Sequence, residues 1–316
     1  MPKLDIVIVN WNAGNLLREC LESIHKTGKI GYELSKVIVV DNASSDDSLN
    51  DLDNLPLPLI IIVNSCNLGF GAACNTGADQ SQADYLLFLN PDTRLYENSI
   101  SEPVGFMESP DNQHVGICGI QLINKERKIS QSCARFPRPV FFFNKILGLD
   151  KFGLKSIKSH FMYEWDHAES RYVDHVIGAF FLVRRLVFKR LKGFDERFFL
   201  YLEDLDFSYR LATTGMKSYY LATAKAYHKG GGTSEQIIAQ RLFYSLYSRI
   251  LYGFKHFRIH AAIALMLVTL TVEPVLRVLG ALYEKSMKKT FQILEGYIML
   301  WTNLPKLVSD CISIKK

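Results

Sequence analysis

The sequence lacks the cysteine pattern of a disulfide-bonded or zinc-binding protein. Its six cysteines are scattered, with no CxxC pair and no spacing typical of metal ligands. Isolated cysteines of this kind are typical of small buried side chains in a reducing compartment. The N-terminal stretch MPKLDIVIVNWN contains only a short apolar run, which indicates a first strand instead of a signal peptide. We therefore expect a cytoplasmic protein.

Net charge is absent from most of the chain. Residues 1–251 are neutral, whereas residues 252–316 carry nine Lys or Arg and four Asp or Glu. This distribution predicts that only the last segment is attracted to an anionic surface. Because the neutral remainder shows no basic stripe, we expect no nucleic-acid partner.

A hydrophobic run long enough to span a bilayer is also missing from the pattern. The run IHAAIALMLVTLTV at 259–272 has fourteen residues without Asp, Glu, Lys or Arg, and Glu273-Pro274 then interrupt it. A helix that spans a bilayer needs roughly 20 apolar residues. Basic residues flank the run, which is typical of helices that lie in an anionic membrane interface. The alternatives are a contact in a homo-oligomer or a helix packed over the rest of the protein.

What the sequence does contain is a regular alternation of strand and helix patterns. Apolar runs at 4–10, 36–42, 59–64 and 85–90 alternate with helical patterns. This order predicts an α/β protein with a mostly parallel open sheet and helices on both faces. Residues 176–188 predict a strand that leads into a short helix, and the chain after 234 predicts helices. The segment 135–171 shows no clear period, which predicts a long functional or mobile loop.

Polar residues follow every one of the four apolar runs, where ligands bind in such sheets. The residues concerned are Asn10, Trp11 and Asn12, then Asp41 and Asn42, then residues 64–71 with Asn67 and Gly69, and finally Asn90, Pro91 and Asp92. Turn preference alone explains any one of these positions, but it explains all four together poorly.

Two of these positions suggest chemistry. Asp41 could accept hydrogen bonds from a nucleobase or a ribose hydroxyl, or it could cap a helix, although Ser44 and Ser45 could also serve as caps. Asp92 could anchor a Mg²⁺ or Mn²⁺ ion on a diphosphate, or it could be turn material. The glycine turn at 67–77 lacks the dinucleotide fingerprint because Cys74 occupies a glycine position. A nicotinamide-dependent oxidoreductase is therefore disfavoured.

The stretch FLYLEDLDFSYR, residues 199–210, places three acids within four positions. Helical spacing predicts that Glu203, Asp206 and Arg210 share one side, with an i,i+4 ion pair between Asp206 and Arg210. Asp204 then points away and has no basic partner at i+3 or i+4. Such an isolated carboxylate suits a general base, while the alternative is a set of acids that complement a helix N-terminus.

The ordered motifs VNWN, VVDNASSDDS, NLGFGAACNTG, LFLNPDT, GAFFLVRR, GFDERFFLYLEDLDFSYR and HKGGGTS resemble the family 2 glycosyltransferases of the GT-A fold. Within that family they are most similar to bacterial rhamnosyltransferases that act on polyprenyl-diphosphate-linked sugars. The resemblance covers roughly residues 4–234. It implies a Rossmann-like GT-A catalytic domain. The basic and apolar pattern of the residues that follow predicts a helical membrane-associating segment.

The resemblance also implies roles for individual residues. Asp204 corresponds to the catalytic base, and Glu203 is placed to contact acceptor hydroxyls. Asp92 corresponds to the last acid of the DxD element that holds Mg²⁺ or Mn²⁺, although Asn90 replaces the first acid. His228 corresponds to a histidine near the same metal, with an ordinary packed histidine as the alternative. The nucleotide-sugar pocket would be formed by Asn10, Trp11, Asn12, Asp41, Asn67, Gly69, Asn75, Asn90 and Asp92.

We therefore expect a catalytic domain at 1–234, with a nucleotide-sugar half at 1–95 and an acceptor half at 96–234, and a helical segment at 235–316. The expected reaction is inverting transfer of L-rhamnose from dTDP-L-rhamnose to a polyprenyl-diphosphate-linked saccharide, in the synthesis of an O-antigen or capsule. It would take place at the inner face of the cytoplasmic membrane. One alternative is a hexosyl or galactofuranosyl transferase that uses a UDP-sugar. Another is a catalytically silent nucleotide-sugar-binding protein, which the retained Asp92, Glu203 and Asp204 disfavour.

Overall fold

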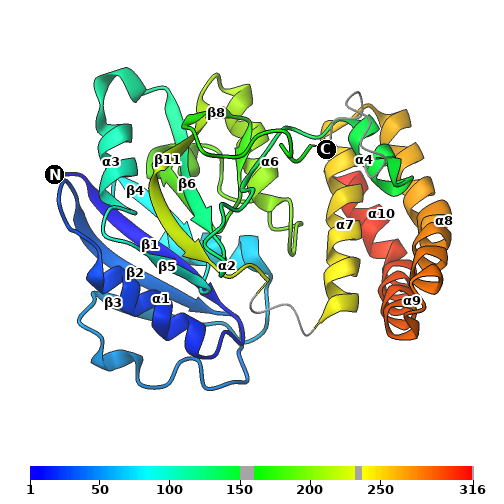
Figure 1. Cartoon of the computed structure of the whole chain (residues 1–316), viewed down its shortest axis with the longest axis horizontal. Coiled ribbons are helices and arrows are strands. Elements are labelled where there is room, and N and C mark those ends of the chain that lie inside the picture. The colour runs from blue at the N-terminus through cyan, green and yellow to red at the C-terminus, as the bar shows by residue number, and fades with distance from the viewer. Residues whose placement is uncertain (150–159, 232–236, 315–316) are drawn as a thin grey trace. The chain divides into compact units, whose positions relative to one another are not determined.

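A computed structural model describes residues 1–149, 160–231 and 237–314 of the chain (Figure 1). By its contacts the chain divides into two compact units, which we treat separately. The first unit comprises Met1–Phe136, Phe161–Glu196 and Glu203–Thr233. The second comprises Pro137–His160, Arg197–Leu202 and Ser234–Lys316.

The first unit is built around a sheet that has nine strands in the described part of the chain. Its strands are β1 (Lys3–Asn10), β2 (Glu33–Asp41), β3 (Leu59–Val63), β4 (Tyr85–Leu89), β5 (Thr93–Leu95), β6 (Val115–Ile123), β8 (Arg171–Val173), β10 (Phe180–Arg184) and β11 (Lys217–His228). They are ordered β3-β2-β1-β4-β10-β6-β11-β5, and β8 pairs with β11. A separate two-stranded sheet joins β7 (Cys133–Ala134) to β9 (His175–Val176).

The sheet is mostly parallel. β1 pairs in parallel with both β2 and β4, and β6 pairs in parallel with β11. β10 runs antiparallel between β4 and β6, and β5 and β8 run antiparallel to β11. The register places Asn10 opposite Asp41 and Asp41 opposite Val63, so the carboxyl ends of the first three strands meet at one edge. The predicted fold class is confirmed.

Helices cover both faces of this sheet, as the continuous burial of β1 and β4 requires. One hydrophobic core includes buried residues of α1 (Asn15–Lys26) and α3 (Ser101–Glu108). The other includes residues of α2 (Phe70–Asp79), α5 (Arg185–Arg190) and α6 (Glu203–Thr213). Two short 3₁₀ turns, Leu52–Asn54 and Pro110–Asn112, complete the unit's helical elements among the described residues.

The described residues of the second unit after 236 form helices, as predicted for the chain after 234. The unit contains α4 (Pro139–Ile146), α7 (Ile238–His256), α8 (Ile259–Tyr283), α9 (Met287–Thr302) and α10 (Leu304–Ser313). Helices α7, α8 and α9 pack against one another. The expectation that 135–171 has no regular structure is wrong at α4, a two-turn helix with proline in its first turn, where the missing N–H costs nothing. Residues 150–159 of that expected loop lie outside the described residues.

The interpretation of residues 259–272 as a segment too short to span a bilayer does not hold for the helix, because α8 runs through Glu273 and Pro274 and is 25 residues long. Glu273 is 1% exposed and accepts hydrogen bonds from Arg249 and Arg277, which neutralise its charge. Pro274 has no N–H to donate to the carbonyl of Leu270, and the indole Nε1 of Trp301 donates to that carbonyl at 3.2 Å. Within the described residues, α8 is the one helix long and apolar enough to cross a membrane.

Candidate active site

The loops that follow β1 and β2 are joined by a network of buried side chains. The Nδ2 of Asn10 donates to Asp41 Oδ1 at 2.7 Å and to Ser48 Oγ at 2.7 Å. Asp41 also accepts from the N–H of Ser44 at 3.0 Å. Both Asn10 and Asp41 are almost fully buried. Two residues predicted for the nucleotide pocket are therefore brought together, and they also hold the loop 42–48 in place.

Asn12 also joins the loops that follow β1 and β2. Its backbone N–H donates to Ser44 Oγ at 2.9 Å, and its Oδ1 accepts from the N–H of Ser45 at 2.7 Å. Residues 44–50 are not helical, so the interpretation of Asp41, Ser44 and Ser45 as helix caps does not apply. Their side chains instead shape a loop at the sheet edge. Trp11 is half-buried at this edge.

Gly69 controls how the chain enters α2. Its φ of 89° lies in a region that favours glycine. Asn67 Oδ1 accepts from the Gly69 N–H at 2.9 Å, and Asn42 Nδ2 donates to the Gly69 carbonyl at 3.1 Å. The helix N-terminus is thus fixed to the loops after β2 and β3. Such a terminus favours negatively charged ligand groups.

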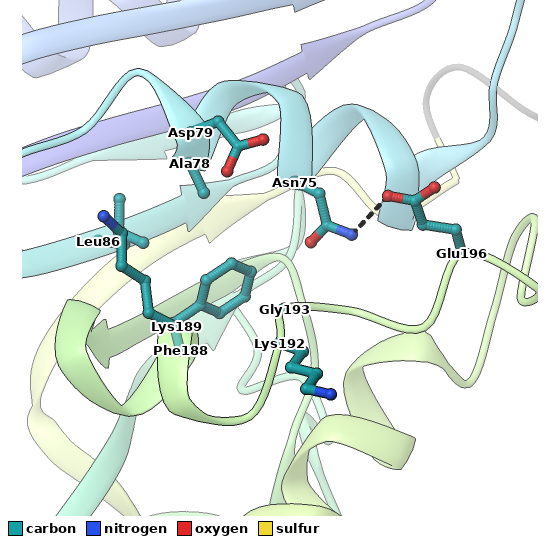
Figure 2. A pocket seen from close by; sticks show the side chains of 9 residues that line it. All are labelled: Asn75, Ala78, Asp79, Leu86, Phe188, Lys189, Lys192, Gly193 and Glu196. Atoms are coloured by element: carbon teal, nitrogen blue, oxygen red, sulfur yellow. Dashed lines mark hydrogen bonds between the residues drawn. The ribbon is translucent and has the colours of Figure 1, made fainter.

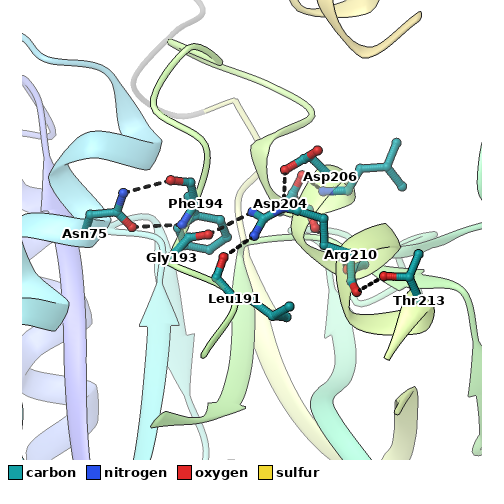
Figure 3. A network of polar contacts seen from close by, with 10 residues as sticks. Asn75, Leu191, Gly193, Phe194, Asp204, Asp206, Arg210 and Thr213 are labelled. Carbon is teal, nitrogen blue, oxygen red and sulfur yellow. Dashed lines mark hydrogen bonds and ion pairs between the residues drawn. The ribbon is translucent and has the colours of Figure 1, made fainter. Parts of the chain in front are cut away.

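Asn75 is oriented toward a different segment from the other predicted pocket residues. Its amide makes two hydrogen bonds with the backbone of Phe194, each at 2.9 Å, and donates to Glu196 Oε1 at 2.9 Å (Figures 2 and 3). A side chain at Gly193 would collide with Asn75, because an added Cβ would lie 2.4 Å from its Oδ1. A cavity of about 470 Å³ lies here, and Lys189 and Lys192 line it. In this structure Asn75 therefore fixes the segment 193–196, and its nucleotide-pocket role stays a prediction.

Asp92 and His228 lie together although the sequence separates them widely. His228 ends β11, which pairs with β5 in a register that places His228 opposite Thr93. His228 Nε2 is 3.3 Å from Asp92 Oδ1, and the N–H of Gly230 donates to Asp92 Oδ2 at 3.1 Å. Asn90 is half-buried at the end of β4, where its carbonyl accepts from the N–H of Thr93.

The Asp92–His228 pair has the chemistry of a partial metal site. The Nε2 of His228 is buried and makes no hydrogen bond within the described part of the chain, which leaves a ligand atom beside a carboxylate. Across residues 1–149, 160–231 and 237–314, no group of three or more His, Cys, Asp or Glu could hold a metal ion. A cation here would therefore take further ligands from water or phosphate.

Helix α6 carries the three acids on its first turns. Asp206 is fully buried and accepts from Arg210 Nε at 2.8 Å, so the predicted i,i+4 ion pair is confirmed. Arg210 also donates to the carbonyls of Leu191 and Gly193, which ties the helix to the segment that Asn75 holds (Figure 3).

Glu203 is 5% exposed. Burial raises the pKa of this carboxyl well above its usual value, and the neighbouring Asp204 carboxylate raises it further. Contact between Glu203 and acceptor hydroxyls stays a prediction.

Asp204 is not isolated, which corrects the interpretation from the sequence. Its Oδ2 accepts from the N–H of Gly178 at 2.7 Å and lies 3.7 Å from His175 Nε2. The side chain is 16% exposed, so the carboxylate is still reached by solvent. The residues just before α6, Tyr201 and Leu202, both have a φ of 68°, a strained conformation that clusters at functional sites.

His175 was missed by the sequence reasoning. It is 4% exposed on β9, with Nδ1 3.0 Å from Ser208 Oγ of α6. A single histidine between Asp174 and Val176 gives no periodic signal, and only the pairing of β9 with β7 and its packing on α6 place it beside Asp204.

The site thus offers a carboxylate that can take a proton, a carboxylate–imidazole pair that can hold a cation, and a rigid polar sheet edge. A sequence profile of glycosyl transferase family 2 matches residues 5–191 of the chain. The match ends before α6 and β11, so it covers Asp92 and His175 but not Asp204 or His228.

Two curated relatives are named as rhamnosyltransferases. The rhamnosyltransferase WbbL of Escherichia coli (strain K12) is 31% identical over 152 residues, which is 46% of this chain. The match spans only about half of that relative, 52% of its length. The N-acetylglucosaminyl-diphospho-decaprenol L-rhamnosyltransferase of Mycobacterium tuberculosis (strain H37Rv) is 24% identical over 247 residues, covering 71% of this chain and 75% of the relative.

A solved structure shares the fold. The mannosyltransferase of Pyrobaculum calidifontis in complex with GDP-mannose and Mn²⁺ superimposes with a TM-score of 0.52 and 16% sequence identity. The superposition covers 96% of this chain and 86% of that protein.

Proposed function

The chain belongs to glycosyl transferase family 2, and from this premise we propose that it is an inverting rhamnosyltransferase. The donor is dTDP-L-rhamnose and the acceptor is a hydroxyl of a polyprenyl-diphosphate-linked saccharide. The names of the two rhamnosyltransferase relatives support the sugar, and one of those names specifies a lipid-linked acceptor. The observation that carries the proposal is the Asp204 carboxylate, held by the Gly178 N–H and still reached by solvent.

Asp204 is the general base of the reaction. It takes the proton of the acceptor hydroxyl while the hydroxyl oxygen uses its electron pair to bond to the anomeric carbon. The bond from that carbon to the donor diphosphate breaks, and its electron pair leaves with the nucleoside diphosphate. Attack from the side opposite the leaving group inverts the anomeric centre. No covalent enzyme intermediate is required.

Asp92 and His228 are the residues that would hold a divalent cation. The fit rests on the buried Nε2 of His228, which makes no hydrogen bond within the described residues and lies 3.3 Å from the Asp92 carboxylate. When bound, Mg²⁺ or Mn²⁺ stabilises negative charge on a diphosphate oxygen. The N–H of Gly230 keeps the Asp92 carboxylate oriented toward this position. The polar edge formed by Asn10, Asn12 and Asp41 would face the nucleotide.

The test uses the full-length protein with dTDP-L-rhamnose and N-acetylglucosaminyl-diphospho-decaprenol as donor and acceptor probes. We expect a rhamnosylated lipid product by mass spectrometry. Asp204→Asn keeps the shape but removes the base, so kcat should fall by about 10²–10⁴ with little change in donor affinity. The matched control is Asp206→Asn on the same helix, which should mainly lower the melting temperature because it leaves Arg210 unpaired. Equal losses of kcat in the two variants would overturn the assignment of the base.

The donor is tested by competition. Transfer from a UDP-sugar but not from dTDP-L-rhamnose would identify a hexosyl or galactofuranosyl transferase of the same fold. Tight donor binding with no transfer from any donor would identify a nucleotide-sugar-binding protein without catalysis.

The metal prediction is tested separately. EDTA should abolish transfer, and Mg²⁺ or Mn²⁺ should restore it. Asp92→Ala should cause a severe loss and His228→Ala a smaller one, because a carboxylate is the stronger ligand for these ions. Full transfer in the presence of EDTA would contradict the prediction.

A further inference from the structure

We propose that His175 is a positioning residue that shares with Asp204 the proton taken from the acceptor hydroxyl. This inference rests on the proposed role of Asp204 as the base. His175 itself does not touch substrate, because it is buried behind the carboxylate.

The contact between the two side chains is suited to a proton transfer. His175 Nε2 faces Asp204 Oδ2 at 3.7 Å. This distance is longer than a hydrogen bond, but hydrogen bonds between catalytic groups are often long before substrate binds and shorten in the complex. The Gly178 N–H holds the same oxygen atom at 2.7 Å, so the carboxylate cannot rotate away without losing that bond.

Hydrogen bonding to Ser208 determines which ring nitrogen carries the hydrogen. Ser208 Oγ lies 3.0 Å from the Asp204 carbonyl oxygen, which can only accept, so the single hydroxyl hydrogen is donated there. The same Oγ lies 3.0 Å from His175 Nδ1 and must therefore accept from it. The neutral ring carries its hydrogen on Nδ1, which leaves the lone pair of Nε2 facing Asp204.

The surroundings keep this ring neutral before the reaction. Burial lowers the pKa of His175, although the carboxylates of Asp204 and Asp174 act to raise it. The strands packed against β9 add no charge at this point, because burial raises the pKa values of Cys133 in β7 and Tyr220 in β11. The resting pair is a carboxylate beside a neutral imidazole.

Proton uptake then balances within the pair. When Asp204 Oδ2 takes the hydroxyl proton, Nε2 can accept it, which leaves an imidazolium beside a carboxylate. Nδ1 keeps its hydrogen and still donates it to Ser208 Oγ, so the ring keeps its orientation. After the product leaves, the proton returns through Asp204 to solvent. A second acceptor behind the base makes return of the proton to the new glycosidic oxygen less favourable.

The test compares His175→Gln with the wild-type protein, using the probes named above. A pair that shares a proton takes it up more readily than a lone carboxylate. We therefore expect the acid limb of the kcat–pH profile to move to lower pH in His175→Gln, with a plateau lower by about 10-fold, less than for loss of the base. The KM for the donor should change less than twofold. If the acid limb of the kcat–pH profile of His175→Gln lies at the same pH as in the wild-type protein, the proposal is overturned and His175 has a packing role.

The matched control is His167→Gln. His167 is also buried, and burial also lowers its pKa, but its Nδ1 contacts the carbonyl of Trp165 instead of Asp204. This variant should leave the acid limb unmoved, whatever its effect on the melting temperature. An equal shift in both variants would show that the profile reports stability and would overturn the proposal.

A second measurement does not depend on any variant or on the donor. ¹⁵N NMR of the wild-type protein near pH 7.5 should show His175 protonated on Nδ1 and not on Nε2. A hydrogen on Nε2 would overturn the proposal even if rhamnosyl transfer is confirmed. Transfer from a different nucleotide sugar would correct the proposed function. The kcat–pH profiles of the wild-type protein and of His175→Gln would then be measured with that donor.

Discussion

At the scale of single residues, Glu203 makes the stability of the fold depend on pH. An unfolded chain releases the proton of this carboxyl near pH 4.3, whereas burial raises the pKa of Glu203 in the folded chain well above that value. Between these two pKa values the unfolded state binds fewer protons, so the free energy of unfolding falls by about 1.4 kcal/mol per pH unit. Glu203→Gln keeps a neutral side chain and should remove this loss.

The measurement is urea unfolding of both proteins between pH 4 and pH 8. We expect equal stability near pH 4 and a growing advantage for Glu203→Gln as the pH rises. The control is Glu126→Gln, because Glu126 is 68% exposed and its substitution should give no pH-dependent gap. A constant difference between Glu203→Gln and wild type across this range would contradict a raised pKa of Glu203 in the folded chain.

The site residues show which interactions a sequence can reveal. The pair Asp206–Arg210 was predictable because both residues share one helix and its 3.6-residue period fixes their spacing. The partners of Asp204 were not predictable. Gly178 and His175 come from a separate segment, which reaches α6 through the small sheet of β7 and β9. Asn75 was assigned to the nucleotide pocket from the family resemblance, while its amide bonds to Phe194, far along the chain.

At the scale of elements, the continuity of α8 depends on an interaction with α9. Pro274 leaves the Leu270 carbonyl without its usual backbone donor, and Trp301 Nε1 donates to it at 3.2 Å. Trp301→Phe keeps an aromatic ring but removes the donor. We expect the free energy of unfolding to fall by about 0.5–1.5 kcal/mol, measured by chemical denaturation.

A double-mutant cycle separates this hydrogen bond from ring packing. In a Pro274→Ala background, the N–H of residue 274 can donate to Leu270, so Trp301→Phe should cost less there than in the wild-type protein. Equal costs in the two backgrounds would show that the indole acts only by packing.

The length and burial of an element determine whether the sequence could reveal it. Strands β1, β2 and β4 are long and mostly buried, so they are near-continuous apolar runs and were predicted within a few residues. β5, β7 and β9 have two or three residues each, too few for any period to be seen. The sequence did not reveal that α8 continues past residue 272, because the partners that compensate Glu273 and Pro274 lie on other helices or one turn further along.

At the scale of the whole molecule, a boundary drawn along the sequence cannot describe units made of separate segments. The extent of the family resemblance placed one boundary near 234, whereas the second compact unit also takes Pro137–His160 and Arg197–Leu202. The assignment of 1–234 as the catalytic domain therefore stays a prediction. The stretch 197–202 leads directly into the acids of α6, so a substitution there can affect both units.

The last prediction concerns attachment of the whole protein to a membrane surface, where a polyprenyl-linked acceptor would lie. Apolar side chains are exposed along α8 and α9 of the second unit, among them Leu267, Leu279 and Phe291 at 53%, 57% and 65%. Residues 252–316 also carry five net positive charges, and each Lys or Arg near an anionic leaflet contributes about 1 kcal/mol. Full-length protein should therefore sediment with phosphatidylglycerol vesicles at low salt. High salt should release only part of it, because apolar contacts are not screened.

Two substitutions on α8 separate the apolar from the electrostatic contribution. Leu267→Gln combined with Leu279→Gln removes exposed apolar surface without changing the charge, so the salt-resistant fraction on the vesicles should shrink while low-salt binding persists. The control is Leu186→Gln on α5 of the first unit, an even more exposed leucine at 73%, which should leave both fractions unchanged. Protein that stays in solution beside anionic vesicles at low salt would contradict surface binding and favour an oligomer contact. Protein that resists an alkaline carbonate wash would instead indicate that α8, 25 residues long, crosses the bilayer.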